Sequence, residues 1–278
     1  MTDLNDWFQT PPGQYLLEWE RAQFDAALAD VFGYHAVQLG LPAVDALSAN
    51  RMPHRWLAST GVASLEAVTR LSTGTEQTPA YSRVAFAADA TALPFAEASL
   101  DLLVLPHTLE LSGDPHATLR EVQRVLVHEG KVAIAGFSPA SLWGLRQWRA
   151  RQWQRVGHGS TYLPDVGEFI SPWRLRDWLR LLEFELEDTA HGCWRPAVRS
   201  ERALARFGWM DRAGARWWPF FGAAYFMLAV KRTHGARLVG AAWKKTPAVV
   251  GAPASVANRS AQPSRPSTRL SEKTCGSD

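Results

Sequence analysis

The stretch LDLLVLP, residues 100–106, is the feature that most constrains the fold of this chain. Five of its first six residues are apolar, and the run stops abruptly at Pro106, His107 and Thr108. A continuous apolar run of this length is typical of a strand that is buried on both faces, as in parallel sheets covered by helices. We therefore expect a central strand here, whose polar end lies at an edge of the sheet.

The residues after this strand predict a helix and then a second strand. Asp114 followed by Pro115 indicates a helix start, because Asp accepts a backbone N–H bond and Pro has no N–H to leave unpaired. Apolar residues then recur at helical spacing up to Gly130, where we expect the helix to end, and KVAIAGF (131–137) has the pattern of a buried strand. Short connections of this kind predict an α/β fold with a mainly parallel sheet.

Weaker patterns of the same two kinds predict the remaining elements. We expect helices at 15–31, 64–71 and 171–184, the first of them ended by Gly33. We expect strands at 34–40, 54–60, 84–90, 185–188 and 222–232, the last as an antiparallel edge strand.

The positive charge of the chain is concentrated at its C-terminal end. The net charge is +3, but residues 234–278 carry seven Lys and Arg against two acids, a net of +5, so the rest sums to −2. That segment is rich in Pro, Ser and Ala, which predicts a disordered basic tail. We divide the chain into an N-terminal helical segment (1–33), a main domain (34–233) with a cap at 138–170, and this tail (234–278).

Cysteine content and apolar runs indicate the compartment. The chain has two cysteines, far apart and without metal-ligand spacing, which argues against a disulfide framework and a zinc site. The N-terminus is acidic and polar, unlike a secretory signal, and the longest apolar stretch has 14 residues (217–230), whereas a spanning helix needs about 20. We expect a cytoplasmic protein without a bound metal.

Ligands of open α/β sheets bind outside the carboxyl ends of the strands. The sequence places Gly40 after the first strand and Asp89 and Ala90 after the third. It places Pro106, His107, Thr108 and Glu110 after the fourth, and Gly136, Phe137 and Ser138 after the fifth. We therefore expect these residues to lie along one edge and to form the binding site.

The segment from residue 84 to 137 resembles class I S-adenosylmethionine-dependent methyltransferases of the type 11 group. That group reads D-A-x-x-L-P-F, then S-F-D and an apolar strand, then H-x-L-E-H, D-P and L-R-E-x-x-R-V-L-x-P-G-G. The matching residues are Asp89, Ala90, Leu93, Pro94, Phe95, Ser99, Asp101, His107, Leu109, Glu110, Asp114, Pro115, Leu119, Arg120, Glu121, Arg124, Val125, Leu126 and Gly130. The layout of the chain is also similar to a proteobacterial subgroup of such proteins.

The resemblance implies a Rossmann-like, doubly wound, mainly parallel seven-stranded sheet with an antiparallel edge strand, and S-adenosylmethionine as cofactor. It implies that Asp89 binds the adenine amino group and that the backbone N–H of Ala90 binds the ring. Residues around Pro106 and His107 would line the methionine side and the route of the methyl group. Asp101, at the amino end of its strand, is expected to be structural.

The glycine loop after the first strand departs from the family pattern D/E-x-G-x-G-x-G. Gln38 replaces the acid, Gly40 is kept, and Pro42 and Val44 occupy glycine positions. Proline fixes φ near −65° and valine resists positive φ, so this loop cannot copy the usual conformation. We retain Gln38 and Gly40 as candidate cofactor contacts.

Methyl transfer from a sulfonium is an in-line displacement, which depends mostly on positioning and needs a base only for weakly acidic acceptors. The candidate bases are His107, His158 and His191. The acceptor is unidentified, and a small molecule is the first expectation.

The stretch SLWGLRQWRARQWQR (141–155) alternates tryptophan and arginine. It could be a cap helix whose tryptophans pack on the sheet, a wall of a substrate pocket, or a contact for RNA or a membrane. The alternative to an enzyme is accordingly a non-catalytic protein of this fold that binds RNA, an anionic membrane surface or a protein partner through this cap, with weak polyanion or membrane contact through the tail.

Overall fold

The computed structural model divides the chain into two units, Met1–Gly235 and Ala236–Asp278. It describes residues 4–60, 84–154, 162–163, 167 and 169–232, all of them in the first unit. The expected tail and the helix expected at 64–71 lie outside the described residues.

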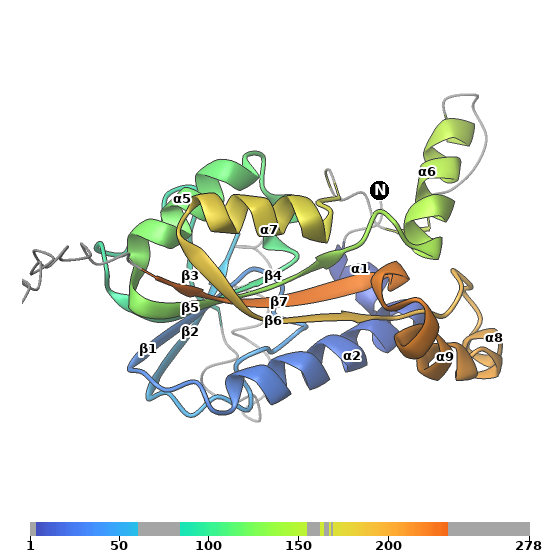
Figure 1. Ribbon diagram of the computed structural model, residues 1–278, viewed down its shortest axis with the longest axis horizontal. Helices are drawn as coiled ribbons and strands as arrows, with labels where there is room; N and C mark the ends of the chain where they lie inside the picture. Colours follow the sequence, from blue (N-terminus) through green and yellow to red (C-terminus); the bar gives the residue numbers. More distant parts are fainter. Residues whose placement is uncertain (1–3, 61–83, 155–161, 164–166, 168, 233–278) are drawn as a thin grey trace, which may run out of the picture. The chain divides into compact units, whose positions relative to one another are not determined.

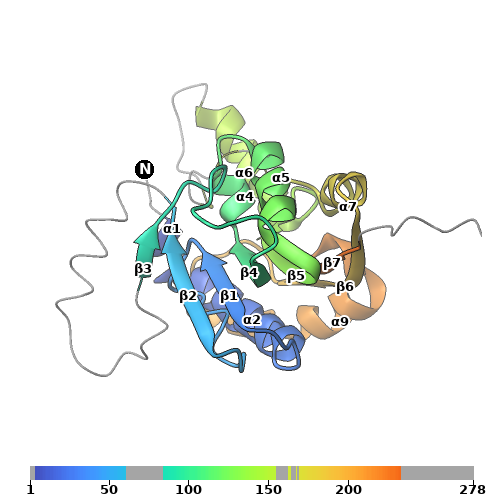
Figure 2. The same cartoon turned by 90° about the vertical axis from the view of Figure 1, so that its left-hand side faces the viewer.

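The first unit is built on a seven-stranded sheet with the order β3-β2-β1-β4-β5-β7-β6 (Figure 2). Its strands are β1 (His35–Leu39), β2 (His54–Ser59), β3 (Val84–Ala87), β4 (Leu100–Pro106), β5 (Leu126–Phe137), β6 (Phe184–Gly192) and β7 (Ala224–Lys231). Strands β1 to β5 pair in parallel. The α/β fold with a mainly parallel sheet is thus confirmed.

The antiparallel strand is β7, the last strand in the chain, as expected. It pairs antiparallel with β5 on one side and with β6 on the other. It therefore lies one position inside the sheet, and β6 forms the edge. This position buries seven of its eight residues, which explains why its sequence is an unbroken apolar run.

Helices cover both faces of the sheet (Figure 1). The helices are α1 (Leu4–Phe8), α2 (Pro11–Leu28), α4 (Thr108–Leu111), α5 (Pro115–Val125), α6 (Leu142–Gln154), α7 (Pro172–Leu181), α8 (Glu201–Arg206), α9 (Trp209–Trp217) and the 3₁₀ turn η2 (Pro219–Phe221). One core cluster joins α1 and α2 to the sheet, and the other joins α5 and α7 to the opposite face. In the described part of the chain, no helix has the length and apolarity needed to cross a membrane.

Helix α2 begins four residues earlier than the apolar spacing suggests. Thr10 caps it by accepting a bond from the backbone N–H of Gly13, and two prolines occupy the first turn, where a missing N–H has no consequence. The apolar residues Leu16, Phe24 and Leu28 form a buried stripe against the sheet. The same stripe contains Glu20, an acid that is fully buried.

The helix predicted to run to Gly130 ends at Val125. Asp114 caps its start as expected, by accepting a bond from the N–H of Ala117. At the other end, the N–H of Ser99 donates to the carbonyl of Val125, and Leu126 pairs with Leu100 of β4. The pairing with β4 therefore takes the chain into strand β5 before the glycine is reached.

Candidate functional site

The carboxyl ends of β1 to β5 lie along one edge of the sheet. Backbone bonds tie the residues that follow them to neighbouring strands: Gly40 to Ala58, Ala88 to Ser59, and His107 to Ala135. The strand order reverses between β1 and β4. Such a reversal is where open α/β sheets bind ligands, and here it lies between Gly40 and His107.

Gly40 turns the chain at the end of β1 with a φ of +86°, which favours glycine. A Cβ at this position would lie 3.4 Å from the hydroxyl oxygens of both Thr60 and Thr108. The Thr108 hydroxyl donates to the carbonyl of Leu39. Residues that follow three different strands therefore meet here. Thr108 was expected at the end of its strand, whereas Thr60, the last residue of the predicted strand 54–60, was not named as a candidate.

Gln38 is buried and binds the loop that follows it. Its amide nitrogen donates to the carbonyl of Leu41 at 2.9 Å, and its amide oxygen accepts from the N–H of Ala46 at 2.9 Å. A carboxylate could not make the first of these bonds because it has no N–H to donate. Glutamine in place of the family's acid therefore suits the altered loop.

The altered loop packs into the core below the sheet. Leu41, Val44 and Leu47 are buried in the cluster that contains α2. Arg21 of α2 donates to the carbonyls of Ala43 and Val44. These carbonyls have no helical N–H to accept from, because the loop contains no helix. The non-glycine residues are thus accommodated by packing rather than by a tight glycine turn.

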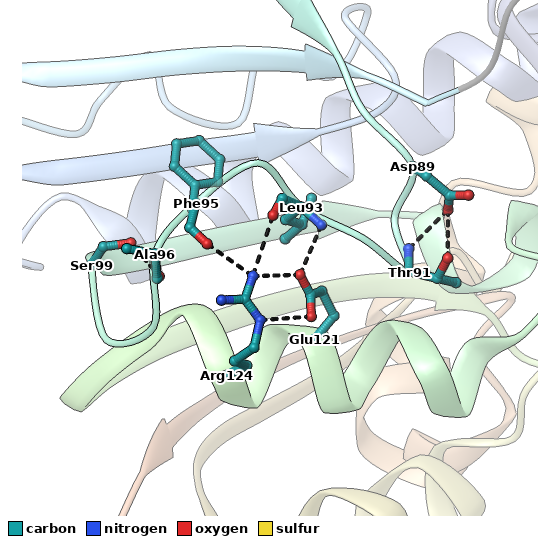
Figure 3. A network of polar contacts seen from close by, with 8 residues as sticks. All are labelled: Asp89, Thr91, Leu93, Phe95, Ala96, Ser99, Glu121 and Arg124. Carbon is teal, nitrogen blue, oxygen red and sulfur yellow. Dashed lines mark hydrogen bonds and ion pairs between the residues drawn. The ribbon is translucent and has the colours of Figure 1, made fainter.

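Asp89 is exposed and lies after β3, in a turn that its own side chain stabilises. Its Oδ1 accepts from the backbone N–H of Thr91 at 2.9 Å and from the Thr91 hydroxyl at 2.8 Å (Figure 3). These bonds favour the charged form and lower the pKa of Asp89. The site therefore presents a fixed, ionised carboxylate beside Ala90, whose side chain is buried.

Glu121 and Arg124 of α5 hold the segment that follows Asp89. The N–H of Leu93 donates to Glu121 Oε1 at 2.8 Å, and the Arg124 guanidinium donates to the carbonyls of Leu93 and Phe95 (Figure 3). The two side chains also pair with each other at 2.6 Å. The L-P-F and R-E-x-x-R parts of the motif are thus two halves of one structural clamp.

His107 occupies the end of β4 between two carboxylates. Its Nε2 lies 2.6 Å from Glu20 Oε1, and its Nδ1 lies 2.9 Å from Glu110 Oε2. All three side chains are fully buried or nearly so. The other oxygen of Glu110 accepts from the N–H of Phe137, so the group connects α2 with the ends of β4 and β5.

The charges around His107 determine its protonation. Burial alone would lower the pKa of His107, but the Coulomb field of Glu20 and the hydrogen bonds to both carboxylates raise it to about 10. Burial also opposes ionisation of Glu110 and raises its pKa. His107 is therefore an imidazolium at neutral pH. Glu20 was not predicted, although its place in the i, i+4 series with Leu16 and Phe24 was visible in the sequence.

The remaining candidates are His191, His158 and Asp101. His191 lies near the carboxyl end of β6, which is on the same edge of the sheet because β6 runs parallel to β5 with β7 between them. His191 lies on β6, where burial lowers its pKa, and His158 lies outside the described residues. Asp101 accepts bonds from the N–H groups of Tyr34 and His35 at 2.9 Å, which confirms its structural role. Among the described residues, no group of three His, Cys, Asp or Glu side chains could hold a metal ion.

Comparison with known proteins shows a family similarity and a shared fold. Residues 45–134 match a family described as "Methyltransferase domain". This part, about a third of the chain, is similar to methyltransferase domains. The type 11 resemblance is thereby confirmed, while the proteobacterial subgroup stays a prediction.

One relative and two solved structures are also similar. The "Uncharacterized protein YafS" of Escherichia coli K12 is 40% identical over 99 residues, which is 36% of this chain and 38% of that protein. The chain thus matches less than half of that relative's length. A SAM-dependent methyltransferase of Thermotoga maritima, a possible histamine N-methyltransferase, has a TM-score of 0.56 at 14% identity over 81% of this chain and 93% of its own. A chain of the complex with the Haloferax volcanii Trm112 methyltransferase activator has a TM-score of 0.51 at 19% identity over 81% and 94%.

The two structural matches show that the chain has the fold of class I methyltransferases. They confirm the Rossmann-like, seven-stranded architecture. The six candidate cofactor residues, Gln38, Gly40, Asp89, Ala90, Pro106 and His107, stay predictions. All six lie at or beside the carboxyl ends of β1, β3 and β4. Asp89 is exposed, and the other five are buried.

Proposed function

We propose that the protein is an S-adenosylmethionine-dependent methyltransferase that transfers a methyl group to an acceptor by in-line displacement. The observation that carries the proposal is the ionised, exposed carboxylate of Asp89, held at the end of β3 by a turn and by the Glu121–Arg124 clamp. A cytoplasmic location, which the cysteine usage suggests, is part of the proposal.

The residues at the adenine end fit an adenosyl group. Asp89 Oδ1 is occupied by Thr91, so Oδ2 is the oxygen that would accept from the adenine amino group. Ala90 would offer its backbone N–H to the ring. A preformed, charged acceptor of this kind gives a strong hydrogen bond because no reorganisation is needed.

The residues at the methionine end fit in a different way. Gly40 is buried where β1, β2 and β4 end, and a Cβ there would already meet the hydroxyls of Thr60 and Thr108 at 3.4 Å, so we assign only its backbone to the methionine end. Gln38 and His107 are enclosed, so we assign them to positioning: Gln38 holds the loop after Gly40, and His107 fixes the end of β4 after Pro106.

S-adenosylmethionine would supply an electrophilic methyl group on a sulfonium. The protein would orient it and exclude water from the reacting atoms, which supplies most of the rate in displacements of this kind. His107 is a poor candidate for the base, because a group whose pKa is raised to about 10 already carries its proton at neutral pH.

The packed loop favours one alternative, a non-catalytic protein of this fold. Leu41 and Val44 fill space in the core, and the amide of Gln38 is used entirely by the protein's own backbone. Such a protein would keep the Asp89 turn for structural reasons only. The two functions differ in whether the adenosyl group binds.

Calorimetric titration of the full chain with S-adenosylhomocysteine separates them. We expect a dissociation constant in the micromolar to sub-millimolar range, because the adenine end at Asp89 is preformed whereas the loop at Gly40 differs from the family pattern. We also expect S-adenosylmethionine to raise the unfolding temperature, as any ligand that binds only the folded state does. Absence of heat and of thermal stabilisation with both ligands at millimolar concentration would contradict the proposal.

A further inference from the structure

A cavity of about 860 Å³ lies between α6, α9 and η2. Its volume is within the range of small-molecule sites, roughly 300–1,000 Å³. Pro139, Ala140 and Ser141, which follow β5, form one wall. The aromatic residues of the lining are Trp148, Phe169, Trp194, Trp209, Trp218 and Phe221.

Specific contacts hold the walls of this cavity in place. The indole N–H of Trp143, on the buried side of α6, donates to the carbonyl of Arg195 at 2.8 Å. On the other side, α9 rests on Trp194 so closely that a Cβ on Gly214 would lie 2.2 Å from its Cγ. The cavity is therefore built into the fold of the domain.

The interior of the cavity offers mainly apolar surface. The Ser141 hydroxyl already binds Ser138 and Gly144, and the Gln147 amide binds the backbone at Tyr162 and Leu163. Arg151 lies over the ring of Phe169, and the described lining residues include no acid. A ligand here would be held by hydrocarbon and ring contacts.

The surface around the cavity is unusually apolar. Nine of the 14 large apolar residues that are exposed in the described part of the chain lie within 142–154 and 209–221. Trp148 and Trp209 are each 59% exposed, and Trp217 is 72% exposed. Trp143 packs inside as expected for a cap helix, but Trp148 and Trp153 do not. An exposed patch of this kind marks an interaction surface.

The same surface is positively charged. The two segments contain five arginines and one acid, Asp211, whose carboxylate is bound by Arg195 and Tyr15. Tryptophan combined with basic residues is typical of the boundary between water and an anionic bilayer, where each basic residue adds about 1 kcal/mol of attraction. Aliphatic Leu142 and Leu145, about half exposed, favour lipid over nucleic acid, because they cannot stack on bases.

We propose that the α6, α9 and η2 surface docks on an anionic lipid bilayer and that the cavity takes the hydrocarbon part of a lipid. The cavity begins at Phe169, whose ring contacts Phe137, and Phe137 contacts His107 at the end of β4. A lipid in the cavity would thus lie beside the carboxyl ends of the strands. One further step rests on the proposed function: if the protein is a methyltransferase, that lipid is the methyl acceptor.

Flotation with vesicles tests the docking surface without any cofactor. We expect the full chain to bind vesicles of phosphatidylcholine with phosphatidylglycerol, to bind pure phosphatidylcholine much more weakly, and to be released by salt. Trp148→Ala combined with Trp209→Ala should reduce binding about tenfold or more. The matched control is Phe32→Ala combined with Tyr34→Ala, two exposed aromatic residues next to the amino end of β1, which should bind like the wild type.

A second variant tests the cavity separately from the surface. Ala213→Phe places a ring in the cavity and leaves its exposed tryptophans unchanged. Because the ring fills part of the cavity volume, we expect this variant to bind a fluorescent fatty acid roughly fivefold or more weakly. We expect its binding to vesicles to be unchanged.

Several results would overturn the proposal: no binding of the wild type to anionic vesicles, equal binding by the tryptophan variant, or self-association or RNA binding through these tryptophans in place of vesicle binding. Because no step uses S-adenosylhomocysteine, failure here leaves the cofactor titration unaffected, and the reverse also holds.

Discussion

Replacing His107 by leucine should lower the free energy of unfolding by about 3–5 kcal/mol, because it leaves two buried carboxylates without the cation between them. This is a large part of the stability of a typical domain, about 5–15 kcal/mol. Urea unfolding at pH 7 measures it. The backbone of His107 has a φ of +54°, so His107→Asn serves as control, since asparagine tolerates this conformation. Equal loss in both variants would assign the effect to charge, and rescue by asparagine would contradict our account.

The pH dependence gives the same prediction a second test. The pKa of His107 is raised from 6.5 to about 10, so its contribution is complete below pH 6.5 and is lost as the pH rises toward 10. The difference in stability between the wild type and His107→Leu should therefore shrink over this window. Burial also raises the pKa of Cys193 and Tyr225, whose ionisation weakens both proteins alike, so the difference between them is the quantity to follow. A difference that stays constant up to pH 10 would contradict the imidazolium.

Replacing Asp89 by alanine should weaken the binding of S-adenosylhomocysteine by about 10- to 150-fold. This corresponds to the loss of a hydrogen bond to a charged group, about 1.5–3 kcal/mol. The substitution also removes the turn with Thr91, so Thr91→Ala is the matched control, which loses the hydroxyl bond but keeps the carboxylate. We expect its affinity to stay within a few-fold of the wild type in the same calorimetric titration. An equal loss in both variants would mean that Asp89 acts only through the turn.

Much of the fold could be predicted because the relevant signals are local. The apolar run before Pro106 and the Asp114–Pro115 cap depend on neighbouring residues, and each is found where expected. The end of α5 was misplaced because a tertiary contact, the pairing of Leu126 with Leu100, overrides the glycine signal. The position of β7 inside the sheet also depends on pairing across the chain, which periodicity does not encode.

The candidate site was predictable only in part for a related reason. Strand ends could be located, so Gly40, Asp89 and His107 were found at one edge. Glu20, the partner of His107, could not be predicted, because it lies 87 residues away in the sequence and reaches His107 only through the packing of α2. The role of Gln38 was hidden in the same way, since its amide is used by a loop whose path depends on the core below it.

Hydrogen exchange followed by mass spectrometry, with and without S-adenosylhomocysteine, tests the central claim most directly, because it locates the bound adenosyl group on the chain. The account predicts slower exchange in peptides that cover the Asp89 turn and the end of β4, with β6 and the amino ends of the strands unchanged. Exchange that is unchanged by the ligand around Asp89, or slowed only at a distant part of the domain, would contradict it.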